Sequence, residues 1–221
     1  MPHVEDAAVE RAVRSFAAVM LGLAAHELNN RLAVMRETVG LMTDLARAGK
    51  AGAAGTERAH SSLDDQVGRA LNIVRTLSGL GGALGAAGGS FDAGAATGDL
   101  VGLTERWARQ QSVRIEREVA ADLPRAGGDP ALFLCLVHRL LTGSAETLQP
   151  GGSILLRAVR DGAAVRVSLH PTGKRAETTA VPGTDDEEIN RELARRLGGS
   201  LVSEGGGIST VRLAALLERA P

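Results

Sequence analysis

The side chains best suited to chemistry lie close together in the segment 23–32, which contains His26, Glu27 and Asn30. In a helix of about 100° per residue, His26 and Asn30 lie one turn apart on an outward face, and Leu28 lies on the opposite side. Glu27 lies beside His26. A neutral imidazole nitrogen is a good nucleophile near pH 7, and a neighbouring carboxylate can orient the ring or take its proton. An amide can hold a water or a phosphoryl oxygen. These three residues are therefore candidates for a catalytic site, and the alternative at this point is that His26 is one exposed histidine on a polar helix face.

Two long helices are predicted to position this site. Between residues 6 and 48, and again between 57 and 86, apolar residues recur at steps of four and three, which is typical of helices packed in a bundle. A glycine- and alanine-rich loop over 49–55 joins the two segments. The pattern predicts an antiparallel helical hairpin. Each apolar stripe needs more cover than one hairpin provides, so we expect a homodimer that forms a four-helix bundle.

Glycine-rich sequence then separates a second domain. We predict a hairpin domain over 1–86, a linker over 87–98 and a second domain over 99–221. In the second domain the apolar periodicity alternates between helical and strand-like, which predicts an α+β fold. The expected helices are 100–110, 130–148 and 185–197, and the expected strands are 113–119, 154–159, 164–169, 201–202 and 210–216.

Composition narrows the possible functions. The chain has 221 residues, with 25 basic and 26 acidic side chains and only 2% aromatic residues, so we expect no nucleic-acid binding. No stretch has the ~20 apolar residues that a membrane-spanning helix needs. The N-terminus has no apolar signal core, and we expect a cytoplasmic protein. The single cysteine, Cys135, excludes a disulfide framework and a thiolate zinc site, and no metal site is predicted.

The run His26-Glu27-Leu28-Asn29-Asn30, followed by Leu32, resembles the phosphoacceptor box of two-component sensor histidine kinases. In that family the histidine lies on the first helix of a dimeric hairpin. Arg31 stands where the family usually has proline, so we expect a weaker bend after the site. The resemblance implies that His26 carries a phosphoryl group.

The second domain resembles the ATP-binding module of the same family in the order of its motifs. Gly128-Asp129-Pro130 resembles the entry to the module's long helix, and the run 139–147 resembles its N-box. The segments 151–154, 197–201 and 206–210 are similar to later motifs of the module. The resemblance implies a degenerate Bergerat-type α/β sandwich, because the residues that handle nucleotide differ.

Three departures concern those residues. Gly143 replaces an asparagine that holds Mg²⁺ in the family, and glycine offers no ligand. The segment 169–174 lacks the carboxylate that recognises adenine. The run 183–188 places four consecutive acids where a triphosphate would lie, and like charges repel it. The same acids are also favourable at a helix N-terminus. We therefore expect no ATP binding and no bound cofactor.

With these departures the chain resembles the dimeric histidine phosphotransferases of the ChpT type. That resemblance implies transfer of phosphoryl groups between receiver-domain aspartates through His26, with response-regulator receivers as partners and Mg²⁺ held by the receiver. Three alternatives stay open: a phosphatase in which Asn30 positions water, a pseudokinase scaffold without chemistry, and an ATP-dependent histidine kinase. Among the remaining residues, we expect His138 to be a structural histidine, Trp107 to lie in the core, Cys135 to be a buried small hydrophobe, and His170-Pro171 to mark a loop.

Overall fold

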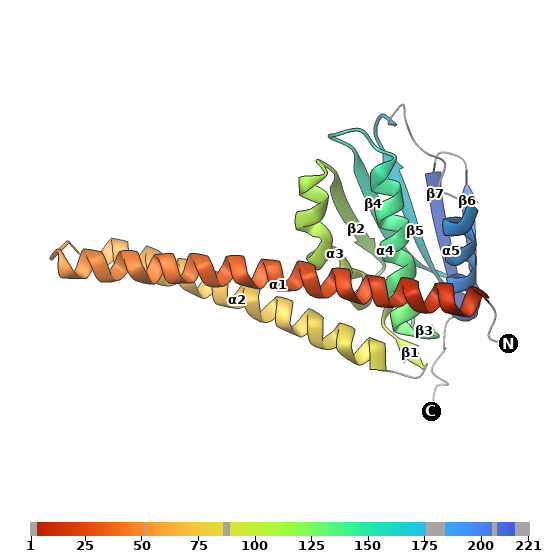
Figure 1. Ribbon diagram of the computed structural model, residues 1–221, viewed down its shortest axis with the longest axis horizontal. Coiled ribbons are helices and arrows are strands. Elements are labelled where there is room, and N and C mark those ends of the chain that lie inside the picture. The colour runs from red at the N-terminus through yellow and green to blue at the C-terminus, as the bar shows by residue number, and fades with distance from the viewer. Residues whose placement is uncertain (1–3, 51, 86–88, 176–183, 205–206, 215–221) are drawn as a thin grey trace. The chain divides into compact units, whose positions relative to one another are not determined.

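A helical hairpin comes first in the protein and an α/β sandwich follows it, which confirms the predicted fold class (Figure 1). The structure is a computed structural model that describes residues 4–50, 52–85, 89–175, 184–204 and 207–214. Internal contacts divide the chain into two units. One unit is Val19–Gly79, and the other combines Met1–Ala18 with Leu80–Pro221. Within the described ranges, no helix is both long enough and apolar enough to cross a membrane.

The hairpin consists of helix α1 (Val4–Arg47) and helix α2 (Ala53–Gly85). Gly49, at a φ of 65°, ends the first helix. The N–H of Lys50 donates to the carbonyl of Leu45 at 2.9 Å, and the N–H of Gly49 donates to that of Ala46 at 3.1 Å. This is the double hydrogen bond of a glycine-terminated helix, in which the left-handed conformation costs glycine little. The glycine-rich loop therefore reverses the chain where the sequence predicts it.

The sandwich contains a five-stranded mixed sheet in the order β2-β4-β5-β7-β6. The first two strands of that order are parallel and every other neighbouring pair is antiparallel. Glycine at position 162, with a φ of 62°, lies in the tight turn between β4 and β5. The strands are β2 (Arg114–Val119), β4 (Ser153–Asp161), β5 (Ala164–Thr172), β6 (Ser200–Glu204) and β7 (Ile208–Ala214).

Helices cover one face of this sheet (Figure 1). They are α3 (Ala93–Gln110), α4 (Pro130–Glu146) and α5 (Thr184–Arg196). The core lies between this layer and the sheet, where burial of large apolar side chains is the main stabilising contribution. Its largest fully buried members are Phe133, Leu136, Leu141, Ile154, Leu156, Leu169, Leu193 and Leu213.

The Gly128-Asp129-Pro130 motif has a clear physical role at the start of α4. The Asp129 carboxylate accepts hydrogen bonds from the N–H groups of Ala131 at 2.7 Å and Leu132 at 3.3 Å. Proline at the first helical position has no N–H that would need such a partner. Gly128 has a φ of 119°, and a Cβ atom there would lie 3.1 Å from the carbonyl oxygen of Leu197. The motif therefore caps the helix and allows the chain to approach α5 closely.

The predicted linker 87–98 is wrong over its described part, 89–98. This part contains β1 (Ser90–Phe91), which pairs with β3 (Ala126–Gly127), and the first turns of α3. The Asp92 carboxylate caps α3 by accepting from the N–H of Ala95 at 2.9 Å. Glycine at position 94 is buried, and a Cβ atom there would lie 2.9 Å from Val119. Glycine in this segment permits close packing, so it does not indicate a flexible connection.

The first turns of α1 belong to the sandwich unit, which differs from the predicted hairpin domain of 1–86. The ring of Phe16 contacts the ring of His138 in α4, with 5.4 Å between centroids. Asp6 forms an ion pair with Arg196 at the end of α5. Hydrogen bonds from Arg195 and Arg196 lower the pKa of Glu192 to about 2. An apolar and a charged contact therefore join α1 to two helices of the sandwich.

Candidate functional site

His26 is exposed on α1, in the unit Val19–Gly79. The helix runs without interruption past this residue from Val4 to Arg47. A proline at position 31 would remove one backbone N–H and disturb the helical hydrogen bonds, whereas arginine keeps that N–H. The imidazole therefore projects into solvent from a part of the helix that is not interrupted.

Glu27 and Asn30 are both half-buried, unlike His26. The Glu27 carboxylate forms an ion pair with Arg31, four residues later. The amide nitrogen of Asn30 is buried and has no hydrogen-bond acceptor among the described residues. The structure thus brings the three predicted residues onto two consecutive turns. The outward face that the sequence predicts for His26 and Asn30 holds for His26, whereas Asn30 is half-buried.

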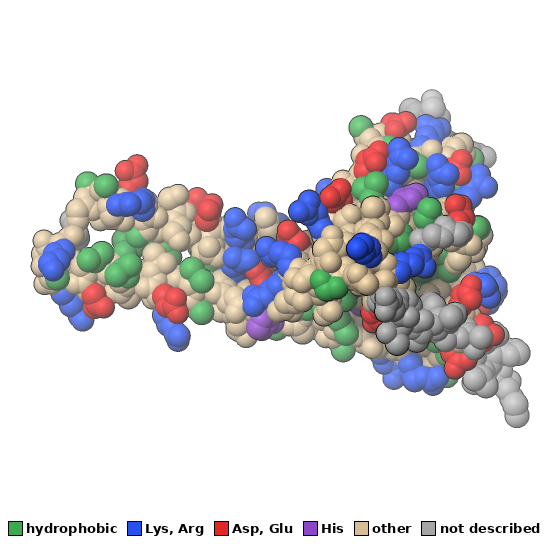
Figure 2. All heavy atoms as spheres, turned by 90° about the horizontal axis from the view of Figure 1, so that it is seen from above, with side chains coloured by type: hydrophobic (Ala, Val, Ile, Leu, Met, Phe, Trp, Pro, Cys, Tyr) green, Lys and Arg blue, Asp and Glu red, His purple; other side chains and the backbone are tan. Residues whose placement is uncertain are grey.

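Apolar side chains of the hairpin are exposed to solvent in a single chain. Figure 2 shows several of them along the hairpin, at the left of the view. Six, from both helices, are between 44% and 57% exposed: Leu21, Leu32, Val39, Val67, Leu71 and Val74. Isolated exposed apolar residues are common, but a repeated series on two adjacent helices is typical of a surface that packs against another protein.

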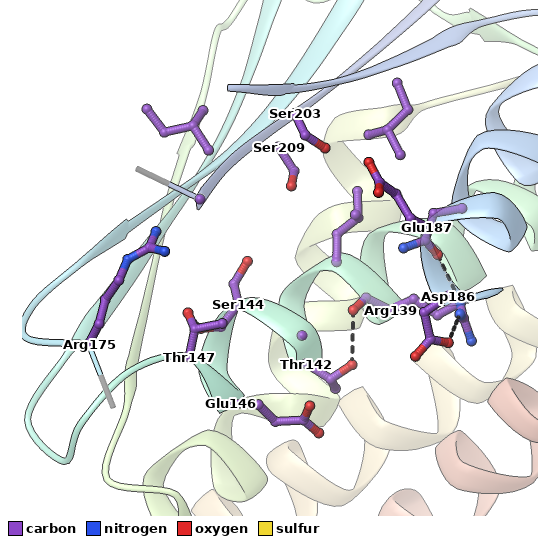
Figure 3. A pocket seen from close by; sticks show the side chains of 16 residues that line it. Arg139, Thr142, Ser144, Glu146, Thr147, Arg175, Asp186, Glu187, Ser203 and Ser209 are labelled. Atoms are coloured by element: carbon purple, nitrogen blue, oxygen red, sulfur yellow. Dashed lines mark hydrogen bonds and ion pairs between the residues drawn. The ribbon is translucent and has the colours of Figure 1, made fainter. Parts of the chain in front are cut away.

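The sandwich unit contains a cavity of about 650 Å³ between α4, α5 and the strands β6 and β7 (Figure 3). Gly143 lines it and contributes no side chain. Arg139 crosses one wall: its Nε donates to Asn190 at 2.7 Å, and its Nη2 donates to Asp186 at 2.6 Å. The carboxylates of Asp186, Glu187 and Glu146 also line the cavity. The cavity is therefore lined by three acids and two arginines, Arg139 and Arg175, and the first of these arginines is already bonded to α5.

The acidic run begins α5, as the sequence predicts. Asp185, Asp186 and Glu187 lie in the first turn of the helix, where negative charge is favourable. Gly183 lies outside the described residues. Among the residues that the structure describes, no group of three or more His, Cys, Asp or Glu side chains could hold a metal ion.

The prediction of a loop at His170-Pro171 is wrong. Both residues belong to β5, where they pair with Leu155 and Ile154 of β4. Proline is tolerated in a strand where its missing N–H is not needed by a neighbour. The Nε2 atom of His170 forms a 2.8 Å hydrogen bond with the hydroxyl of Ser168. The apolar stretch predicts a strand that ends at residue 169, but β5 continues to Thr172.

Three other residues have structural roles. Burial against α1, together with the charge of Arg139, lowers the pKa of His138 to about 4. Cys135 is fully buried, as expected of a small hydrophobe, and burial raises the pKa of its thiol to about 11. Trp107 is half-buried on α3, so the prediction that it lies in the core is wrong.

Two polar clusters were not predicted from the sequence. One joins Arg139 to Asp186 and Asn190, and the other joins Arg31 to Glu27 and to Gln66 of α2. The i,i+4 spacing of Asp186 and Asn190 was a usable signal for one shared helix face. The sequence near Arg139 or Arg31, in contrast, contains nothing that indicates which residue of another helix each arginine contacts.

No protein-family model matches the chain, and no curated protein matches it. Among solved structures, the chain is similar to the catalytic domain of the histidine kinase ThkA, with 15% identity and a TM-score of 0.49 over 59% of this chain and 97% of that one. It is similar to the Acinetobacter baumannii histidine kinase AdeS, with 15% identity and a TM-score of 0.47 over 86% and 98% of the two chains. It is also similar to a bacterial phosphotransferase, with 16% identity and a TM-score of 0.45 over 89% and 94%.

Proposed function

We propose that this chain is a histidine phosphotransferase of a two-component phosphorelay. His26 accepts a phosphoryl group from the aspartate of one response-regulator receiver and passes it to the aspartate of another. The observation that carries the proposal is the exposed position of His26 on an unbroken helix of the hairpin, at the start of the phosphoacceptor-like motif. An exposed imidazole can meet a reactive group on a separate protein, which a buried one cannot.

The reaction needs no oxidant or reductant. A nitrogen of the neutral imidazole attacks the phosphorus of the aspartyl phosphate, and the N–P bond forms as the P–O bond to the aspartate breaks. The receiver's carboxylate leaves, and the proton on the other ring nitrogen passes to a base or to solvent. Glu27 is the nearest such base in sequence. Phosphohistidine and acyl phosphate are both energy-rich, so the group can move in either direction.

ATP is a poor candidate for the phosphoryl donor of this chain. Gly143 leaves the cavity without a Mg²⁺ ligand at the position where the related kinases carry asparagine. Asp186 and Glu187 place negative charge at the cavity wall, and the ion pair with Arg139 holds the first of them there. A triphosphate would meet these carboxylates, and the asparagine that holds its Mg²⁺ in the kinases that the chain resembles is replaced by glycine. The donor is therefore a receiver, whose own acidic pocket supplies the Mg²⁺.

A second copy of the chain covers the exposed apolar face of the hairpin in this proposal. The side chains on that face recur on both helices, as a four-helix bundle requires. Each dimer then presents one His26 from each chain.

The proposal is tested by mixing the purified chain with a receiver domain that carries a ³²P-labelled aspartyl phosphate. We expect the label to move to this chain and to be acid-labile, as phosphohistidine is, and to be mapped to His26 by mass spectrometry. Release of free phosphate without labelled chain would instead indicate a phosphatase. An unchanged receiver that still co-purifies with the chain would indicate a scaffold.

A further inference from the structure

A polar cluster lies between the two helices of the hairpin, directly beside the candidate phosphoacceptor. Arg31 forms its ion pair with Glu27 through Nη2, and its Nη1 donates to the side-chain oxygen of Gln66 in α2 at 3.2 Å. The side chains of Arg31 and Glu27 are only 25% and 19% exposed. We call these three residues the seam cluster. It links the residue next to His26 to the opposite helix.

The seam cluster contributes less to the stability of the helix interface than apolar side chains would. The Nε atom of Arg31 is buried and has no acceptor among the described residues, and an unpaired buried donor costs free energy. Charged pairs that are largely withdrawn from water contribute little net stability compared with apolar packing. The best-attested role of such polar groups between packed helices is to fix their register. The cluster is thus better suited to fixing a geometry than to adding stability.

The geometry it fixes is that of the Glu27 side chain. A glutamate on a helix surface samples several rotamers, but the guanidinium of Arg31 restrains this one by an ion pair and is itself restrained by Gln66. His26 and Glu27 are consecutive residues of one continuous helix. A carboxylate that is held in one position on the helix serves the reaction better than a mobile one, because it needs no reorganisation when charge develops.

We propose that Arg31 is a positioning residue of the phosphoacceptor site: it holds Glu27 in place for His26 and makes the reactivity of His26 depend on α2 through Gln66. This inference rests on the proposed function, since it concerns phosphoryl acceptance by the same histidine. It assigns a role to the residue that stands in place of the proline usual in the related kinases.

The test uses potassium phosphoramidate, a small phosphodonor that needs no receiver. The imidazole nitrogen attacks phosphorus, the N–P bond to the ring forms, the P–N bond of the donor breaks and ammonia leaves, while the ring's other proton passes to Glu27 or to solvent. His60, which is exposed on α2 of the same hairpin, serves as an internal reference. The measured quantity is the ratio of the phosphorylation rates of His26 and His60 in one sample, followed by mass spectrometry or ³¹P NMR.

We expect His26 to react faster than His60 in the unchanged protein and Arg31→Met to lower the ratio roughly tenfold, within the range of coupling between residues in contact. Glu27→Gln should lower it by a similar factor, and the double substitution should lower it no further. Arg31→Lys should restore part of the ratio, because it keeps the charge beside Glu27 but not the fork that also reaches Gln66. Gln66→Leu should lower the ratio less than Arg31→Met does.

Arg14→Met is the matched control. Arg14 forms an ion pair with Glu10 at the same i,i+4 spacing on the same helix, but both side chains are exposed and remote in sequence from the site. This substitution should leave the ratio unchanged. A merely structural effect of Arg31→Met would persist undiminished in the Glu27→Gln background, and that result would overturn the inference, as would an unchanged ratio in Arg31→Met. If His26 of the unchanged protein is phosphorylated no faster than His60, then His26 is no more reactive than another exposed histidine. That result would contradict the proposed function itself.

Discussion

The rings of Phe16 and His138 lie against each other with 5.4 Å between centroids and 53° between planes. Phe16 is fully buried on the first turns of α1, and His138 is half-buried in the middle of α4. The contact therefore places a titratable ring in the apolar junction between the first helix and the sandwich. Burial, and secondarily the charge of Arg139, lowers the pKa of His138 to about 4.

This contact predicts a loss of stability in mild acid. Because the folded pKa of His138 lies below the value of about 6.5 for an unfolded histidine, the unfolded chain binds the proton first as the pH falls. Stability is then lost from about pH 6.5 down to about pH 4. Between about pH 7.5 and pH 5 the loss from this residue is about 2 kcal/mol. Urea unfolding followed by Trp107 fluorescence at both pH values measures it.

His138→Phe is the matched variant for this measurement, because it keeps an aromatic ring against Phe16 but cannot take up a proton. Carboxylates also titrate in this range, so the relevant quantity is the difference between the two proteins. We expect the acid-dependent loss to be smaller in His138→Phe by about 2 kcal/mol. Equal losses in both proteins would show that His138 titrates alike in the folded and unfolded states.

The cavity predicts that Mg²⁺–ATP does not bind measurably. Calorimetry should give no dissociation constant below about 1 mM, which corresponds to roughly 4 kcal/mol of binding free energy. Gly143→Asn should not create binding, because it supplies one Mg²⁺ ligand while Asp186 and Glu187 still line the cavity. A dissociation constant in the micromolar range for the unchanged chain would contradict the proposal that a receiver is the only phosphoryl donor.

Features that depend on neighbouring residues were predictable from the sequence, and contacts between distant residues were not. The start of α4 follows from Asp129 and Pro130, and the heptad spacing indicates both hairpin helices. The bond from Arg139 to Asn190 joins residues 51 positions apart, and that from Arg31 to Gln66 joins residues 35 apart. Which side chains meet at such separations depends on the packing of whole helices, and no single segment encodes it.

The linker error has the same origin. Glycines near position 94 favour a flexible connection when the segment is considered alone. In the fold they allow α3 to pack closely against the end of β2, which is a property of the tertiary contact. At the candidate site, the exposure of His26 agrees with the helical wheel, whereas burial of the Asn30 amide nitrogen depends on surroundings that the wheel does not include.

The exposed apolar face of the hairpin predicts that charge placed on it separates the proposed dimer. Leu32 is 56% exposed and Val39 is 51% exposed in a single chain. Leu32→Glu together with Val39→Glu should convert a dimer into monomers at micromolar concentration, because a dimer would bury both charges without partners. Light scattering reports the mass directly. Glu37→Lys, on the helix face about 150° from this stripe, is the control and should leave the dimer intact. An unchanged protein that is monomeric at this concentration would contradict the proposed bundle.

Substitution of His26 tests the chemistry separately from the assembly. His26→Ala should abolish transfer of label from a phosphorylated receiver, because the attacking nitrogen is lost and no other atom of the site can replace it. The same variant should keep the dimer and the unfolding free energy to within ~0.5 kcal/mol, as expected for an exposed side chain. His60→Ala removes another exposed histidine, from the other helix of the hairpin, and should leave transfer unchanged. Transfer that survives in His26→Ala, or a monomeric His26→Ala protein, would mean that the phosphoacceptor lies elsewhere or that α1 presents a different face to its partner.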